Sequence, residues 1–176
     1  MHAIDRAITA IETFFGWFAK LALVAMMLLV CADAGGRYLF AHPVPGVYEI
    51  TEFYLMVALI FLSFAMTQRV GGHVRADVFF DLFPIRVQKT LEVIYLLAAL
   101  VLFALIAWAA TRTSINNFEA NRWTTGVVPI PTGPSWGIAA LGAWVFCLRL
   151  GLQATLILRG GDIAGRGADA PEIHDV

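Results

Sequence analysis

The chain has 176 residues, of which 60% are hydrophobic and only 14% are charged, whereas soluble domains are roughly 45–50% apolar. Its 12 basic and 13 acidic residues leave a formal net charge of −1. The chain therefore lacks the basic surplus that neutralises nucleic-acid phosphates, and we expect no nucleic-acid partner. The two cysteines lie alone in separate apolar stretches, which excludes a disulfide framework. The composition indicates that membrane lipid surrounds this protein.

Four apolar blocks are long enough to cross a bilayer, whose core of about 30 Å needs about 20 helical residues. They cover residues 14–34, 47–66, 93–110 and 136–158. Each block is expected to be a helix, because unpaired backbone groups are prohibitive in hydrocarbon. The predicted fold class is all-α: an integral membrane protein with four transmembrane helices in one domain, residues 1–160, and a polar tail over 161–176.

The first block has a second interpretation as a secretory signal. Residues 32–34 have the small-x-small pattern of a cleavage site. However, Lys20 splits the apolar run and Glu12 precedes it, which favours an uncleaved span.

Charged residues lie on both sides of the first predicted turn, where prolines and a glycine at 43–46 separate two spans. Asp33 and Arg37 are four residues apart, so they can pair if the first helix continues to Arg37. Glu49 and Glu52 open the second span, where the helix dipole favours carboxylates. Two interpretations stay open: these acids cap the helix and remain in water, or they form a polar cluster with Arg37 that fixes the hairpin or a partner subunit.

The connection after the second span is unusually apolar. Its apolar residues between 74 and 83 can share one helical face, which predicts an amphipathic segment in the membrane interface. His73 and Asp77 are four residues apart, a spacing that can hold a metal ion. A structural or interfacial histidine is the favoured interpretation of His73.

The last connection and the last span carry two further features. Three prolines between residues 129 and 134 predict a stiff, extended approach to the fourth helix. Arg149 lies about 13 Å from the inner end of the fourth block at 1.5 Å per residue. It can reach toward the inner interface, pair with Glu92, or face a partner protein.

The sequence carries no sign of catalytic, cofactor or metal chemistry at membrane depth. All four histidines lie outside the apolar blocks, whereas a b-type haem needs axial histidines inside the membrane. No Ser-His-Asp arrangement, P-loop or HExxH motif is present. We therefore expect a protein that is not an enzyme and binds no cofactor.

The distribution of basic residues predicts the orientation. Nine of the twelve Lys and Arg residues lie in the N-terminal segment, in the connection after the second span or toward the C-terminus, and three lie in the other two connections. Cytoplasmic loops are enriched in Lys and Arg. Both termini are therefore predicted to be cytoplasmic.

Several segments together resemble a known family. The RYLF run at 37–40, the acids Glu49 and Glu52, the RVGGHVRAD run at 69–77 and the LFP triplet at 82–84 are similar to the small membrane subunit, DctQ type, of tripartite ATP-independent periplasmic (TRAP) transporters. The resemblance covers about residues 10–160. One departure is Ile50 beside Glu49, where many members carry adjacent acids.

The resemblance implies a scaffold subunit in the bacterial inner membrane. It implies a large membrane subunit and a periplasmic substrate-binding protein as partners, and uptake of an organic acid coupled to an ion gradient, usually sodium. The large subunit would hold the substrate and ion sites. Candidates for fixing hairpins or the subunit interface are Arg37, Glu49, Glu52, His73, Asp77 and Arg149. Small residues of the fourth block are expected to allow close approach to the partner: Gly137, Ala139, Ala140, Gly142 and Ala143. The alternative is a self-sufficient small oligomeric transporter or channel.

Overall fold

The computed structural model describes residues 2–69 and 85–158. The elements in chain order are α1 (His2–Phe40), α2 (Val47–Ile50), the π-helical turn η1 (Thr51–Leu55), α3 (Met56–Arg69), α5 (Ile85–Glu119) and α6 (Gly133–Leu158). Because α2, η1 and α3 follow one another without a break, they form one helix over residues 47–69. The predicted all-α class, with four helices long and apolar enough to span a membrane, is confirmed. The predicted interfacial segment lies outside the described residues.

Two of the helices are much longer than the apolar blocks that predicted them. With 39 and 35 residues, α1 and α5 measure about 58 and 52 Å at 1.5 Å per residue. A hydrocarbon core of about 30 Å covers only part of that length. Apolar composition located the lipid-embedded middle of these helices, whereas their polar ends continue as helix beyond it.

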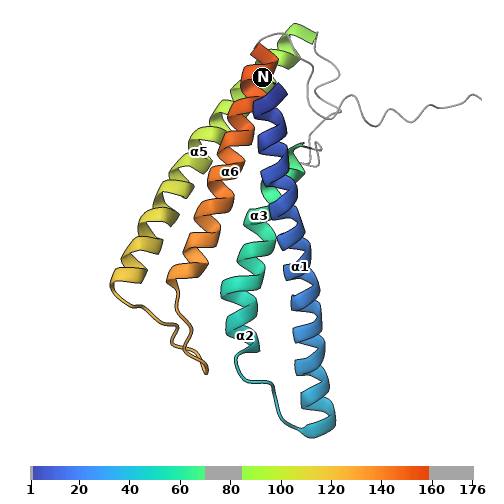
Figure 1. Cartoon of the computed structure of the whole chain (residues 1–176), viewed down its shortest axis with the longest axis vertical. Coiled ribbons are helices and arrows are strands. Elements are labelled where there is room, and N and C mark those ends of the chain that lie inside the picture. The colour runs from blue at the N-terminus through green and yellow to red at the C-terminus, as the bar shows by residue number, and fades with distance from the viewer. Residues whose placement is uncertain (1, 70–84, 159–176) are drawn as a thin grey trace, which may run out of the picture.

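The helices lie side by side in a row, in the order α1, α3, α6, α5 (Figure 1). Within the most apolar window of each span, 56% of the α6 residues are buried, against 17% in α1, 6% in the helix over 47–69 and 17% in α5. The most buried helix is therefore α6, whereas α1 and α5 expose many large apolar side chains and the helix over 47–69 is mostly half-buried. His2 and Leu158 lie at one end of the row, here called the termini end; the turns over 41–46 and 120–132 lie at the other, the connection end (Figure 1).

The core lies between α3, α5 and α6. Its centre holds three aromatic rings, one from each helix: Phe64, Phe103 and Phe146 have ring centroids 4.6–5.6 Å apart. Leu96 of α5 and Leu150 of α6 continue this core toward the termini end and are each 1% exposed. Dispersion between closely packed side chains holds the three helices together.

The small residues of α6 pack inside this chain. Ala139, Ala140 and Ala143 are at most 6% exposed, and a Cβ atom at Gly142 would lie 2.6 Å from the backbone carbonyl carbon of Phe61. The expectation that they allow a partner subunit to approach was wrong for these four residues, because α6 is the central helix of the row. Small side chains instead let neighbouring helices of the same chain approach closely.

Candidate functional site

The first turn is fixed by Asp33, near the end of α1. Its carboxylate lies 2.8 Å from the guanidinium of Arg37 one helical turn away, which confirms the predicted pair. The other carboxylate oxygen accepts a hydrogen bond of 3.0 Å from the backbone N–H of Val44. Ala41 takes a left-handed conformation with φ 53°, so the chain reverses directly after Phe40. Asp33 thus ties the turn over 41–46 to the helix that precedes it.

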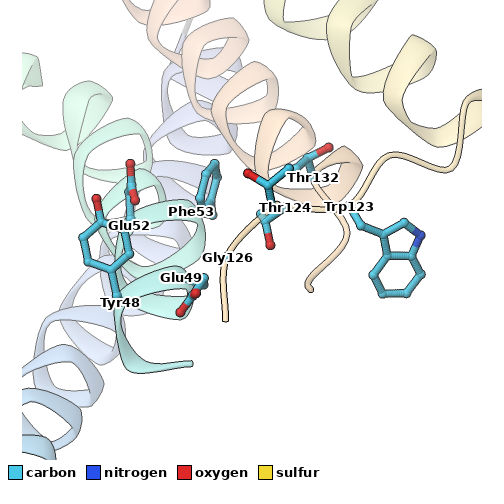
Figure 2. Close-up of a pocket in the computed structure, with 9 residues that line it drawn as sticks. Tyr48, Glu49, Glu52, Phe53, Trp123, Thr124, Gly126 and Thr132 are labelled. Atoms are coloured by element: carbon cyan, nitrogen blue, oxygen red, sulfur yellow. The ribbon is translucent and has the colours of Figure 1, made fainter. Parts of the chain in front are cut away.

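Glu49 joins the second span to the last connection. Its side chain is buried, with 5% exposed, and its Oε1 accepts a hydrogen bond of 2.6 Å from the backbone N–H of Val127. Gly126 leaves the room for this contact, because a Cβ atom there would collide with the carboxylate (Figure 2). Glu49 therefore does not remain in water, and it holds the 120–132 turn rather than the first hairpin.

The connection over 120–132 is a folded hairpin-like turn. The N–H of Thr124 donates to the carbonyl of Ile130 at 2.9 Å, and the N–H of Thr132 donates to that of Arg122 at 3.0 Å. The hydroxyl of Tyr54 then donates a hydrogen bond of 2.6 Å to the carbonyl of Pro131. The proline-containing segment before α6, which was predicted to be stiff and extended, is thus folded back on itself and packs on the second span.

A cavity of about 380 Å³ opens between these two elements. Tyr48, Glu52 and Phe53 line it from the helix, and Thr124, Gly126 and Thr132 are among those that line it from the turn (Figure 2). Tyr48 lies one helical turn before Glu52, on the same side of the helix (Figure 2). Glu52 is exposed, so this cavity presents a negative charge at the connection end.

Three charged side chains meet at the termini end. Glu12 of α1 is fully buried, with 0% exposed. Its carboxylate lies 3.6 Å from Nε of Arg149 in α6 and 3.7 Å from a guanidinium nitrogen of Arg69 at the end of α3. A buried carboxylate needs such partners, because an isolated charge in a low dielectric is very costly. We call these three residues the charge cluster.

Two glutamine side chains lie beside the charge cluster. Nε2 of Gln68 donates a hydrogen bond of 2.7 Å to Oε1 of Gln153, and Nε2 of Gln153 donates to the backbone carbonyl of Gln68 at 3.3 Å. Both side chains are buried. Polar contacts therefore join α1, α3 and α6 at this end, whereas the middle of the row is apolar.

Residues 26–160 match the family described as "Tripartite ATP-independent periplasmic transporters, DctQ component". The chain belongs to this family. No curated relative matches the chain. The matched region begins inside α1 and continues past the end of α6, so it includes the last part of the first membrane-spanning helix and all of the other three. As a DctQ component, the chain is part of a transporter and of no enzyme family.

The candidate residues of this DctQ component fall into separate places. Arg37 pairs with Asp33, and it does not join Glu49 and Glu52 in one cluster. Arg149 contacts Glu12 at the termini end, a pairing that the sequence analysis did not consider. His73 and Asp77 lie outside the described residues. Their roles at a subunit interface stay predictions.

Glu12 is the residue that sequence reasoning missed. It lies in a segment that includes other charged residues, so nothing in its neighbours marks it as buried. Glu12, Gly16 and Ala19 nevertheless share one face of α1 at helical spacing, and all three are buried. An acid at helical spacing from two small residues was therefore the sequence signal that Glu12 packs against another helix.

The contact between Glu49 and the 120–132 turn of this DctQ component can be measured directly. A charge-assisted hydrogen bond contributes about 1.5–3 kcal/mol, so Glu49→Ala is expected to speed hydrogen exchange of the Val127 amide about tenfold to hundredfold. The matched control is Glu52→Ala, which removes an acid one turn on and should leave this amide unchanged. Equal protection of Val127 in the wild type and Glu49→Ala would contradict the contact.

Proposed function

We propose that this DctQ component is the accessory scaffold subunit of a TRAP-type secondary transporter. In this proposal it binds the large membrane subunit and supports ion-coupled uptake of an organic acid that a periplasmic binding protein delivers. It lies in the bacterial inner membrane with both termini in the cytoplasm. Family membership supports the transporter assignment, and the excess of basic residues near the termini end supports the orientation.

The observation that carries the scaffold role is the apolar surface that the two edge helices of the row expose. Only α6 is largely buried within the chain, and α1 and α5 expose most of their apolar windows at the two edges of the row. Large apolar side chains are exposed along both edge helices, among them Trp17, Leu28, Leu105 and Trp108. This broad apolar surface offers area for a second membrane protein beside the lipid that covers the rest.

The charged residues have two roles in this proposal. Glu52 and Arg37 are exposed at the connection end, so they are available to a partner at the membrane surface. Arg149 is 8% exposed and contacts Glu12, so it acts by holding the helices that form the partner surface.

The test is sodium-dependent uptake of candidate organic acids into proteoliposomes that contain the large membrane subunit and the binding protein, with and without this chain. We expect uptake only when the chain is present. Glu52→Ala and Arg149→Ala are each expected to lower recovery of the complex and uptake together, and Arg149→Ala alone should also lower the thermal stability of the isolated subunit.

Two outcomes would reject the scaffold role. Undiminished uptake without the chain would show that it is dispensable. Uptake by the chain alone would instead support a self-sufficient oligomeric transporter. Full uptake with an intact complex in both variants would reject the roles given to Glu52 and Arg149.

A further inference from the structure

The cavity beside Glu52 shares two lining residues with a second cavity that lies farther along the helix over 47–69. The second cavity, of about 440 Å³, lies between α3, α5 and α6. Glu52 and Phe53 line both cavities. Below them the walls become apolar, with residues from three helices: Val57, Phe61, Ile106, Ala109 and Ala139. We call the two cavities together the amphipathic groove.

The chemistry of the amphipathic groove changes along the helix axis. Glu52 lies five residues into the span over 47–69, close to the connection end. Phe61 lies nine residues further on, or about 14 Å at 1.5 Å per residue. The polar end of the groove at Glu52, here called the mouth, is therefore near the membrane surface. The apolar part of the groove runs parallel to the lipid chains.

The carboxylate of Glu52 at the mouth can accept further hydrogen bonds from a bound group. The carboxylate of Glu49 is buried and accepts the hydrogen bond from Val127. Glu52 is exposed and lies one helical turn from Tyr48. Among the residues that the structure describes, no basic side chain forms an ion pair with Glu52. The mouth is complementary to a cation that carries N–H donors.

A third cavity provides a comparison within the same molecule. It has about the same size, 390 Å³, and lies between α1, α3 and α6, where the walls include Phe15, Leu55 and Ala58. Leu55 and Ala58 of the second span line this cavity, whereas Val57 and Phe61 line the amphipathic groove. No charged residue lines this cavity. The combination of a carboxylate and an apolar groove thus distinguishes the amphipathic groove.

We propose that the amphipathic groove binds a membrane phospholipid with a cationic amine headgroup. The ammonium group contacts the carboxylate of Glu52, and one acyl chain lies along Val57, Phe61 and Ala109. A basic side chain of a partner protein would occupy the mouth alone and leave the apolar part unfilled. A phospholipid of the surrounding bilayer places its headgroup at the membrane surface, beside the mouth, and its acyl chains deeper in the membrane, beside the apolar part. It therefore matches the whole groove.

The test uses the full chain in nanodiscs with equal amounts of phosphatidylethanolamine and phosphatidylglycerol. The protein is extracted in mild detergent, and the lipids that remain bound are counted by native mass spectrometry. We expect one retained phosphatidylethanolamine per chain, favoured over phosphatidylglycerol by at least about threefold, the order of effect of one exposed charge pair. Phosphatidylglycerol carries no cation for Glu52.

Two variants separate the headgroup contact from the chain contact. Glu52→Gln should abolish the headgroup preference, and Ala109→Phe should abolish retention, because Ala109 is exposed on α5 and a larger ring there fills the groove without entering the core. The controls are Glu119→Gln, which removes an exposed acid at the same end, and Ala98→Phe, which adds the same ring to an exposed position three turns away on α5. Both controls should behave as wild type.

The proposal fails if phosphatidylglycerol is retained as well as phosphatidylethanolamine, or if both groove variants retain lipid as wild type does. It also fails if a photo-crosslinking residue at position 109 captures the large subunit rather than lipid in the assembled transporter. None of these lipid measurements requires transport, so their result is independent of the proposed function.

Discussion

Glu12→Ala is expected to lower the free energy of unfolding by about 3–5 kcal/mol, the cost of removing one partner from a buried ion pair. Glu12 is 0% exposed and lies between Arg149 and Arg69. Its removal takes an opposite charge away from the guanidinium of Arg149, whose side chain is 9% exposed. The measurement is denaturant unfolding of the full chain in detergent micelles, followed by tryptophan fluorescence.

Two further variants distinguish the charge cluster from a general loss of packing. Asp33→Ala removes an acid from the same helix, but it loses one hydrogen bond from Val44 and a pair with Arg37 whose side chain is 66% exposed, so we expect a smaller loss than for Glu12→Ala. Glu12→Gln combined with Arg149→Gln removes both charges of this pair together and should recover part of the loss. The cluster has no special role if Glu12→Ala and Asp33→Ala destabilise the protein equally.

The apolar blocks made the number and approximate position of the membrane helices predictable from sequence. Helix ends were less predictable, because composition reports lipid exposure and not helicity. The predicted third span ended at residue 110, whereas α5 continues to Glu119 through the polar residues Arg112 and Asn117. Outside the hydrocarbon, a helix no longer needs apolar side chains, so its last turns carry no hydropathy signal.

The contacts of the candidate residues were predictable only where they are local. Asp33 and Arg37 are four apart, and helix geometry alone places them together. Glu12 and Arg149 come from the first and last helices, so only tertiary packing brings them into contact. The partner of Glu49 is the backbone N–H of Val127, a donor that every residue except proline has. No side-chain pattern could have identified it.

The two ends of the row are held by different kinds of contact. At the termini end the charge cluster joins side chains of α1, α3 and α6. At the connection end Glu49 and Tyr54 bind backbone groups of the 120–132 turn. Between them the helices pack mainly through apolar side chains, with isolated polar contacts such as the hydrogen bond of 3.2 Å from the indole N–H of Trp144 to the hydroxyl of Thr111. Polar contacts should therefore compensate least for the loss of stability caused by a substitution in the middle of the row.

Gly142 is the position where such a change is expected to have the second largest effect. A Cβ atom there would lie 2.6 Å from the carbonyl carbon and 2.8 Å from the Cβ of Phe61. Because the nearest atoms include helix backbone, no side-chain rotation relieves the collision, and α3 must move away from α6. Gly142→Ala is therefore expected to destabilise the protein by about 1–3 kcal/mol, as overpacking does in other cores.

Gly151 provides the matched control on the same helix. No heavy atom lies within 4 Å of a Cβ atom built at Gly151, so Gly151→Ala removes only the backbone freedom of glycine and should stabilise α6 by about 0.5–1 kcal/mol. The two identical substitutions should thus shift the midpoint of unfolding in micelles in opposite directions. If Gly142→Ala were as stable as Gly151→Ala, the close approach of α3 and α6 would not exist, and the row would lack the tight central contact that keeps its two halves together.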